Sequence, residues 1–131
     1  MELIIEVIPR TKKNSQNIIL VKGRPIIIPS QYYKQFEKEC KMLIQKQYKQ
    51  KIDYPVNIKA IFYMNSKRKV DLTNLLEALD DMLITTEVIA DDNRDIIVGH
   101  DGSRVYYDKE RPRIEITITK EEGYETWRKR T

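Results

Sequence analysis

Residues 67–92 read KRKVDLTNLLEALDDMLITTEVIADD and contain the clearest helical pattern in the chain. When the middle of this stretch is placed on a helix at about 100° per residue, its apolar side chains gather on one side. These side chains are Leu72, Leu75, Leu76, Leu79, Met82 and Leu83. The opposite side carries Thr73, Asn74, Glu77, Asp80 and Asp81. We therefore expect a helix that packs on a core and leaves a row of acids exposed or lining a cleft.

The segments around this helix predict a β-sheet. Residues 56–64 alternate between apolar and polar side chains, which indicates a strand that leads into the helix. Two short β-branched runs, 18–21 and 26–28, flank the sequence KGRP and predict a hairpin with a basic tip. Further strands are expected at residues 2–8, 96–98, 104–107 and 113–119.

A second helix is expected to begin at Ser30, whose side chain suits the N-cap position. Its apolar face would carry Tyr33, Phe36, Cys40, Leu43, Ile44 and Tyr48. Its opposite face is rich in lysine and glutamine, which is typical of a solvated surface. The order of these elements predicts an α/β fold of the α+β type, in which two main helices pack on a mixed β-sheet. We expect one domain over residues 1–131, with a loosely ordered charged tail at about 120–131 anchored only by Trp127.

Composition limits the class of protein. The 131 residues are 40% hydrophobic and 34% charged, which is typical of a globular chain. The formal net charge of +4 is compatible with nucleic acid without requiring it. A single cysteine, Cys40, excludes an internal disulfide and suits a reducing compartment. The N-terminus lacks a signal-peptide pattern and no apolar run approaches the roughly 20 residues of a membrane span. We therefore expect a cytoplasmic protein with no membrane partner.

The acids of the central stretch are candidates for a metal site. A few carboxylates held together bind Mg²⁺, which orients water and stabilises negative charge during phosphodiester hydrolysis. The candidates are Asp71, Glu77, Asp81, Asp91 and Asp92. Structural alternatives stay open: an N-cap at Asp71, a capping box formed by Asn74 with Glu77, and a turn formed by residues 91–93.

Other chemistries find little support in the sequence. His100 is the only histidine and has no obvious partner in the sequence. With four glycines there is no glycine-rich phosphate loop, so no small-molecule cofactor is expected. Basic residues recur near the acids, and such side chains neutralise DNA phosphates. They are Arg10, Lys12, Lys13, Lys22, Arg24, Lys67, Arg68, Lys69 and Arg94.

Several segments, in this order, resemble the RusA-type Holliday junction resolvases of bacteria and their phages. They are PRTKKNSQ (9–16), GRPIIIPSQYY (23–33), KRKVDLTNLLEALDDML (67–83), VIADDN (88–93) and ERPRIEITI (110–118). The most specific parts are D-x-x-N at residues 71–74 and the acid pair at residues 91–92. The resemblance implies a small homodimer that binds four-way DNA junctions and nicks two strands symmetrically with Mg²⁺ or Mn²⁺.

The resemblance also implies roles for individual residues. Asp71 and Asp92 match the family's metal-binding aspartates, Asn74 matches the asparagine of its motif, and Asp81 matches a recurrent acid. The expected catalytic set is Asp71, Glu77, Asp81 and Asp92, and the expected metal ligands are Asp71, Glu77, Asp91 and Asp92. The expected DNA-binding residues are Lys12, Lys13, Asn14, Lys67, Arg68, Lys69 and Asn74.

Two departures from the family pattern lie on the central helix. Thr73 replaces the family's second aspartate, and Glu77 replaces its essential lysine. Our hypothesis is that Glu77 reaches back to the metal, while Lys67, Lys69 or Lys12 takes the place of the lysine. Two alternatives stay open: a non-catalytic protein of the same fold that binds DNA junctions, and a structural or regulatory phage protein.

Overall fold

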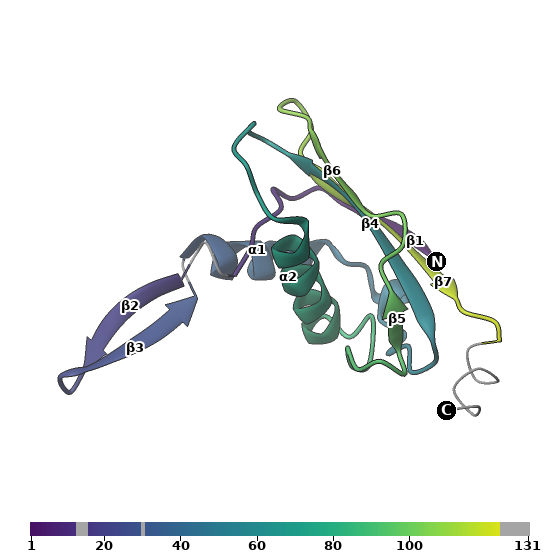
Figure 1. The fold of residues 1–131 in the computed structure, drawn as a ribbon, viewed down its shortest axis with the longest axis horizontal. Helices are drawn as coiled ribbons and strands as arrows, with labels where there is room; N and C mark the ends of the chain where they lie inside the picture. Colours follow the sequence, from purple (N-terminus) through teal and green to yellow (C-terminus); the bar gives the residue numbers. More distant parts are fainter. Residues whose placement is uncertain (13–15, 30, 124–131) are drawn as a thin grey trace.

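The structure, a computed structural model, describes residues 1–12, 16–29 and 31–123 (Figure 1). The N-terminal half contains the strands β1 (Glu2–Ile5), β2 (Gln16–Val21) and β3 (Arg24–Pro29), the helix α1 (Gln31–Leu43) and the 3₁₀ helix η2 (Lys46–Tyr48). The C-terminal half contains β4 (Val56–Met64), α2 (Leu72–Thr85), β5 (Ile97–Gly99), β6 (Arg104–Tyr107) and β7 (Arg113–Lys120). The helix expected from the central stretch is therefore α2.

The main sheet is mixed, with the order β1-β7-β4-β5 and with β6 also paired to β4. β7 is antiparallel to both β1 and β4, whereas β5 and β6 run parallel to β4. Because side chains alternate between the faces of a strand, the apolar positions of β4 and β7 share one face. These are Val56, Ile58, Ala60, Phe62, Ile114, Ile116 and Ile118, all buried. The expected mixed sheet with two helices is confirmed.

Both helices pack on this apolar face (Figure 1). From α1 the buried side chains are Tyr33, Phe36 and Cys40, and from α2 they include Leu75, Ala78, Leu79, Met82 and Leu83. All of them belong to one core cluster with the sheet residues, and a fully buried Leu or Met contributes roughly 1.5–3 kcal/mol. Burial also raises the pKa of the Cys40 thiol to about 12, as expected for a core residue.

β2 and β3 form a separate two-stranded sheet that projects from the body of the molecule (Figure 1). Their register runs from Gln16↔Pro29 to Val21↔Arg24, which leaves a two-residue turn of Lys22 and Gly23. Both turn residues have positive φ, 51° and 78°, as a type I′ hairpin turn requires. The expected hairpin is confirmed, with longer strands and a shorter turn than its sequence indicated.

Several element boundaries differ from the expectation. β1 ends at Ile5 because the chain turns there, with the Val7 amide bonded to the Ile5 carbonyl at 2.9 Å. α1 ends at Leu43, which is 47% exposed rather than buried because it lies beside the stripe of Phe36, Cys40 and Ile44. The expected N-cap Ser30 and the tail with Trp127 fall outside the described residues. Within the described ranges, no helix is long and apolar enough to span a bilayer.

Candidate active site

Asp71 occupies the N-cap position of α2, with extended backbone angles (φ −83°, ψ 125°). Its carboxylate makes no capping hydrogen bond to the helix and instead accepts one from Asn74 Nδ2 at 3.3 Å. The side chain is exposed, so the carboxylate is open to a ligand at the start of the helix. The alternative of a capping box formed by Asn74 and Glu77 is wrong, because the helix begins at Leu72, before either residue.

Farther along α2, Asp81 meets a base from a distant part of the chain. Lys12 Nζ donates to Asp81 Oδ2 at 2.6 Å, and the same ammonium lies 5.3 Å from the centroid of the Tyr33 ring. Glu77 is exposed between the two aspartates. Asp71 and Asp81 are ten positions apart, which corresponds to about 15 Å along a helix axis. One metal ion therefore cannot contact both carboxylates directly within one chain.

The chain after α2 is anchored in the core before it reaches the acid pair. Val88 and Ile89 are buried, and Ile52 pairs with this segment through the bonds Ile52 N to Val88 O and Ala90 N to Ile52 O. These bonds, at 3.1 and 2.9 Å, fix where the turn of residues 91–93 begins.

Within that turn the two aspartates have different environments. Asp91 accepts hydrogen bonds from the Asp92 amide at 2.8 Å and from Asn93 Nδ2 at 3.2 Å, and these bonds lower its pKa. The pKa of Asp92 is raised by partial removal from water, by its hydrogen bond with Asp91, and by the charges of Asp91 and Asp81. The turn alternative therefore holds for Asp91, while Asp92 is electrostatically coupled to Asp81.

The acids thus form two groups: Asp71 with Asn74 at the start of α2, and Asp81 with Asp92 toward its end. Within the described part of the chain, no three Asp, Glu, His or Cys side chains are placed to hold a metal ion together. Mg²⁺ is nevertheless commonly bound through one or two carboxylates, with waters and substrate phosphates completing its shell. The oxygen donors of either group fit such an open site and do not form a closed one.

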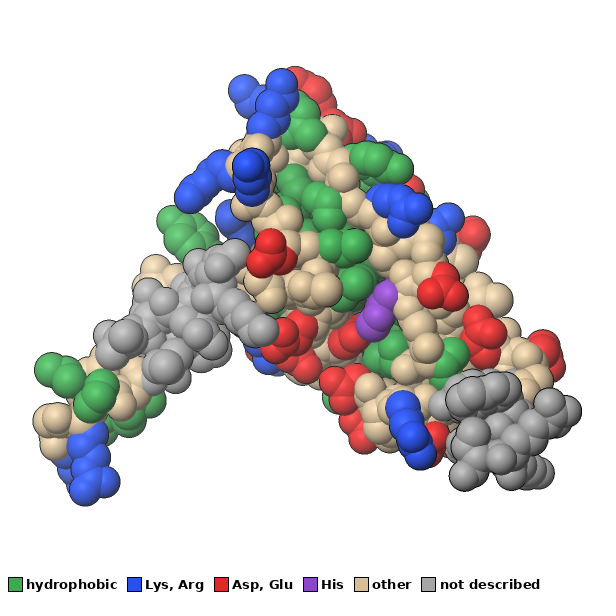
Figure 2. All heavy atoms as spheres, in the orientation of Figure 1, with side chains coloured by type: hydrophobic (Ala, Val, Ile, Leu, Met, Phe, Trp, Pro, Cys, Tyr) green, Lys and Arg blue, Asp and Glu red, His purple; other side chains and the backbone are tan. Residues whose placement is uncertain are grey.

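The bases expected to bind DNA take different positions. Arg68 and Lys69 line a pocket at the N-terminus of α2, and Lys67 Nζ lies 5.2 Å from the centroid of the Tyr107 ring. In Figure 2, lysine and arginine side chains gather at the upper end of the molecule, and acidic side chains lie below them on the same face. Lys13 and Asn14 fall outside the described residues. A positive region bordering the acids suits a polyanion that must approach a carboxylate site.

Asp80 and His100 depart from the expectation. The sequence predicts Asp80 in a row of acids that is exposed or lines a cleft. In the structure Asp80 is only 9% exposed, and His100 Nε2 lies 3.0 Å from its Oδ1 and 2.9 Å from its Oδ2. His100 therefore has a partner. One signal in the sequence indicates that Asp80 is buried: its neighbours on the helix surface, Leu76 at i−4 and Leu83 at i+3, are both apolar. The histidine itself carried no such signal, because the contact joins residues 20 positions apart.

A mixed sheet that carries an acid-lined helix bordered by bases is compatible with a protein that acts on nucleic acid. The sequence profile of a family described as "Endodeoxyribonuclease RusA" matches residues 6–119 of this chain. The protein belongs to the RusA endodeoxyribonuclease family. None of the curated proteins compared with the chain matches it. The family consists of endonucleases that resolve Holliday junctions, bind branched DNA and generally depend on a metal ion.

Proposed function

We propose that this protein is a Mg²⁺-dependent endonuclease, with Mn²⁺ as a substitute, that resolves four-way junctions by paired symmetric nicks in DNA recombination and repair. The observation that carries the proposal is the exposed Asp71 carboxylate at the start of α2, bordered by Arg68 and Lys69, in a chain of the RusA family. The place of action would be the cytoplasm of a bacterial or phage-infected cell.

In this proposal each group of acids supplies one principal metal ligand, Asp71 at the start of α2 and Asp92 toward its end, with Asp91 and Glu77 as further donors and Asp81 as a catalytic acid. A bound Mg²⁺ would activate water and offset the charge that develops on the scissile phosphate. Asn74 orients the Asp71 carboxylate through its hydrogen bond, and Lys12 offsets the charge of Asp81. In the proposal, Lys67, Arg68 and Lys69 hold DNA phosphates. Lys13 and Asn14 are proposed to bind DNA phosphates as well.

Glu77 is proposed to supply the carboxylate that Thr73 lacks. Both side chains are exposed and lie four positions apart, so they occupy adjacent places on one face of α2. Glu77 is six positions from Asp71, about 9 Å along the helix axis. At that separation the two carboxylates can approach the same phosphate group more readily than they can both bind one metal ion directly. Glu77 would therefore act through a water or through a second ion.

The acid row is tested by cleavage of a labelled four-way junction with Mg²⁺ and with EDTA. We expect Asp92→Asn to lose at least about 100-fold in cleavage rate, because charge stabilisation at the phosphate depends on this carboxylate. Glu77→Gln should lose activity in the same assay if its carboxylate is needed. Asp53→Asn is the matched control, since Asp53 is exposed and lies outside α2 and the turn that follows it. Full activity of Asp92→Asn would contradict the proposed site.

The rival function is that of a junction-binding protein without catalysis. Thr73 and Glu77 favour this function, because they stand where the family pattern has an aspartate and a lysine. It predicts tight junction binding with no cutting under Mg²⁺ or Mn²⁺, and in that case Thr73→Asp is the first reversion to make. A purely structural or regulatory phage protein predicts no salt-dependent DNA affinity, so a salt titration of binding separates it from both.

A homodimer is part of the proposal. Paired symmetric nicks need two active sites related by a two-fold axis, which a homodimer supplies and a monomer does not. The four-way junction has matching two-fold symmetry, so each site would meet an equivalent strand.

A further inference from the structure

A basic pocket of about 490 Å³ opens at the N-terminus of α2. Arg10, Arg68 and Lys69 line it, and Val70 and Leu75 contribute apolar wall. Among the described residues no acidic side chain lines this pocket, so its local charge is strongly positive. The volume is in the range of pockets that hold small ligands, roughly 300–1,000 Å³. The ligand that such a lining favours is an anion with an apolar part.

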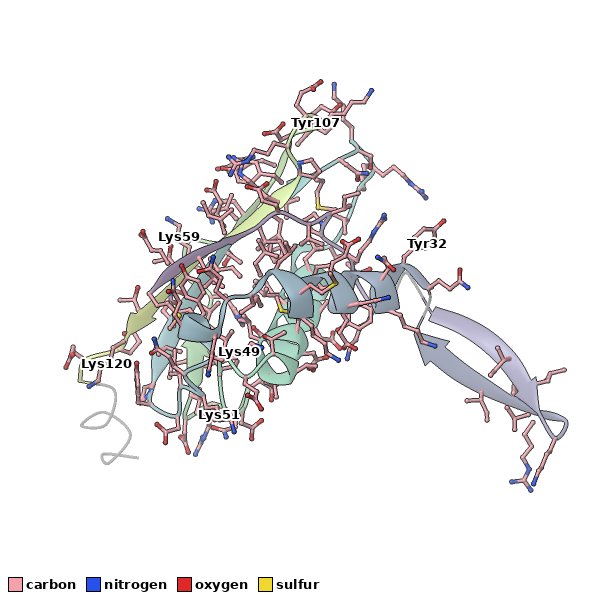
Figure 3. The ribbon with its side chains drawn as sticks, turned by 180° about the vertical axis from the view of Figure 1, so that it is seen from behind. Tyr32, Lys49, Lys51, Lys59, Tyr107 and Lys120 are labelled. Atoms are coloured by element: carbon pink, nitrogen blue, oxygen red, sulfur yellow. The ribbon has the colours of Figure 1, made fainter. Side chains whose placement is uncertain are left out.

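Tyr32 supplies an aromatic surface in the same pocket. It projects near the start of α1, beside the root of the β2–β3 hairpin (Figure 3). The Arg10 guanidinium lies 5.0 Å from the centroid of the Tyr32 ring, yet Tyr32 remains 66% exposed. An exposed aromatic ring beside arginine and lysine is the combination that holds a nucleotide, with the nucleobase stacked on the ring and the phosphate bound by the positively charged side chains.

We propose that this pocket binds one nucleotide from the branch point of the junction, with its base on Tyr32 and its phosphate on Arg68 and Lys69. The inference rests on the proposed function and adds a specificity-determining residue, Tyr32, to it. Within a duplex, both faces of every base are covered by stacked neighbours. In an open four-way junction the base pairs at the branch point have no stacked neighbour on one side, so a stacking surface on the protein favours branched over continuous DNA.

The position of the pocket connects it to the candidate active site. Lys69 and Val70 of its lining directly precede Asp71 in the chain. A nucleotide seated against Tyr32 would therefore leave the adjoining phosphodiester near the start of α2. Recognition of the branch and placement of the strand would be one event.

The first test measures binding in EDTA, so that cleavage is not required. A four-way junction and a duplex of the same sequence are titrated with wild type, Tyr32→Ala and Tyr32→Phe. We expect Tyr32→Ala to weaken junction binding about tenfold and to leave duplex binding unchanged, while Tyr32→Phe keeps the ring and binds like wild type. Tyr54→Ala is the matched control, because Tyr54 is also exposed and has the Lys120 ammonium 5.4 Å from its ring centroid.

Two further readouts separate stacking from charge. A 2-aminopurine base at the branch point should change its fluorescence on binding wild type and not on binding Tyr32→Ala. Arg68→Gln and Lys69→Gln should each lower the slope of log affinity against log salt concentration by about one, which corresponds to the loss of one phosphate contact.

The outcomes distinguish this inference from the function on which it rests. If wild type binds and cuts the junction while Tyr32→Ala keeps both its preference for junctions and the 2-aminopurine signal, the nucleotide pocket is refuted and the nuclease stands. If wild type shows no salt-dependent affinity for any DNA, the proposed function fails and the pocket fails with it.

Discussion

Lys12, which follows β1 in the chain, contacts one of the acids of α2. Its ammonium contacts Asp81, a residue 69 positions away in the chain. Of the three lysines considered as substitutes for the family's helix lysine, Lys12 is the one that meets an acid of α2 within the described residues. Lys67 instead lies over Tyr107, and Lys69 lines the pocket beside Asp71. We therefore favour Lys12 for that role.

The role of Lys12 predicts the effect of its removal. Lys12→Gln should slow single-turnover junction cleavage about tenfold or more, because Asp81 and Asp92 would then repel each other and the phosphate without a compensating cation. Lys12→Arg should retain more activity because the charge is kept. The control is Lys67→Gln, which removes one positive charge elsewhere. Equal losses in Lys12→Gln and Lys67→Gln would mean that only the general positive charge matters.

Asp108 gives a prediction of pH dependence. Arg113 Nη1 donates to Asp108 Oδ2 at 2.9 Å, and this bond is the main cause that lowers the pKa of Asp108 below its ordinary value of 3.8. The folded state therefore favours the ionised carboxylate more than the unfolded chain does. This contribution to stability is present above pH 3.8 and is lost as the pH falls through the lower pKa of the folded state.

Asp108→Ala should accordingly lower the thermal midpoint at pH 7, with a difference from wild type that shrinks as the pH falls well below 3.8. Thermal melts at a series of pH values measure this difference, with Asp53→Ala as the control for an exposed acid. A difference that stays constant down to the lowest pH would show that Asp108 acts without its charge.

At the scale of elements, a break along one edge of β4 brings His100 to Asp80. β5 pairs with the beginning of β4 and β6 with its end, both in parallel. Residues 100–103 cross the gap, where Ser103 Oγ accepts a hydrogen bond from the Ala60 amide at 3.0 Å. The Asp101–Gly102 turn expected from the sequence lies here, with Gly102 at φ 88°. The break leaves His100 beside the helix instead of in a strand.

The β2–β3 hairpin gives a prediction about stability. Its strands pair only with each other in the described structure, and Leu20 is 73% exposed. Deleting the pairs Ile19↔Ile26 and Leu20↔Pro25 shortens the hairpin and keeps its turn. We expect the thermal midpoint to move by no more than about 2 °C, because these residues are not part of the core.

The matched comparison for the hairpin is Leu79→Ala in α2. Leu79 is fully buried, so this change should cost about 2–5 kcal/mol. A shortened hairpin that destabilises the protein as much as Leu79→Ala would show that the hairpin packs on the body or on a second chain.

At the scale of the molecule, the two faces of the main sheet differ. The helices cover one face, and the opposite face carries side chains such as Lys59, Tyr63, Tyr106 and Glu115, with Arg113 stacked 3.7 Å from the Tyr63 ring centroid. The candidate active site belongs to the helical side. DNA that follows the bases around the N-terminus of α2 would therefore approach the molecule from that side.

The proposed homodimer predicts the pattern of products. On a plasmid that extrudes a cruciform, a two-site enzyme should convert supercoiled DNA directly to linear DNA, because both nicks occur within one encounter. Light scattering should give about twice the chain mass of 15.6 kDa. Accumulation of nicked circles by a protein of single-chain mass would contradict the dimer.

The sequence predicted the elements well because their signals are local. The period of two in β4 and β7, the helical period in α2 and the KGRP turn all depend on residues within a few positions of one another. The same reasoning placed Asp71 at the start of its helix and Asp91 in a turn. It erred at Leu43 and Asp80, where burial depends on which neighbour a helix edge meets.

What the sequence determined by itself was the type and order of the elements, the family resemblance and the acids and bases that carry the proposed chemistry. Only the tertiary structure decided that Lys12 meets Asp81, that Asp80 holds His100, and that Arg10, Tyr32, Arg68 and Lys69 line one pocket. These are contacts between segments far apart in the chain, and the packing of the helices on the sheet, rather than any local pattern, brings such segments together.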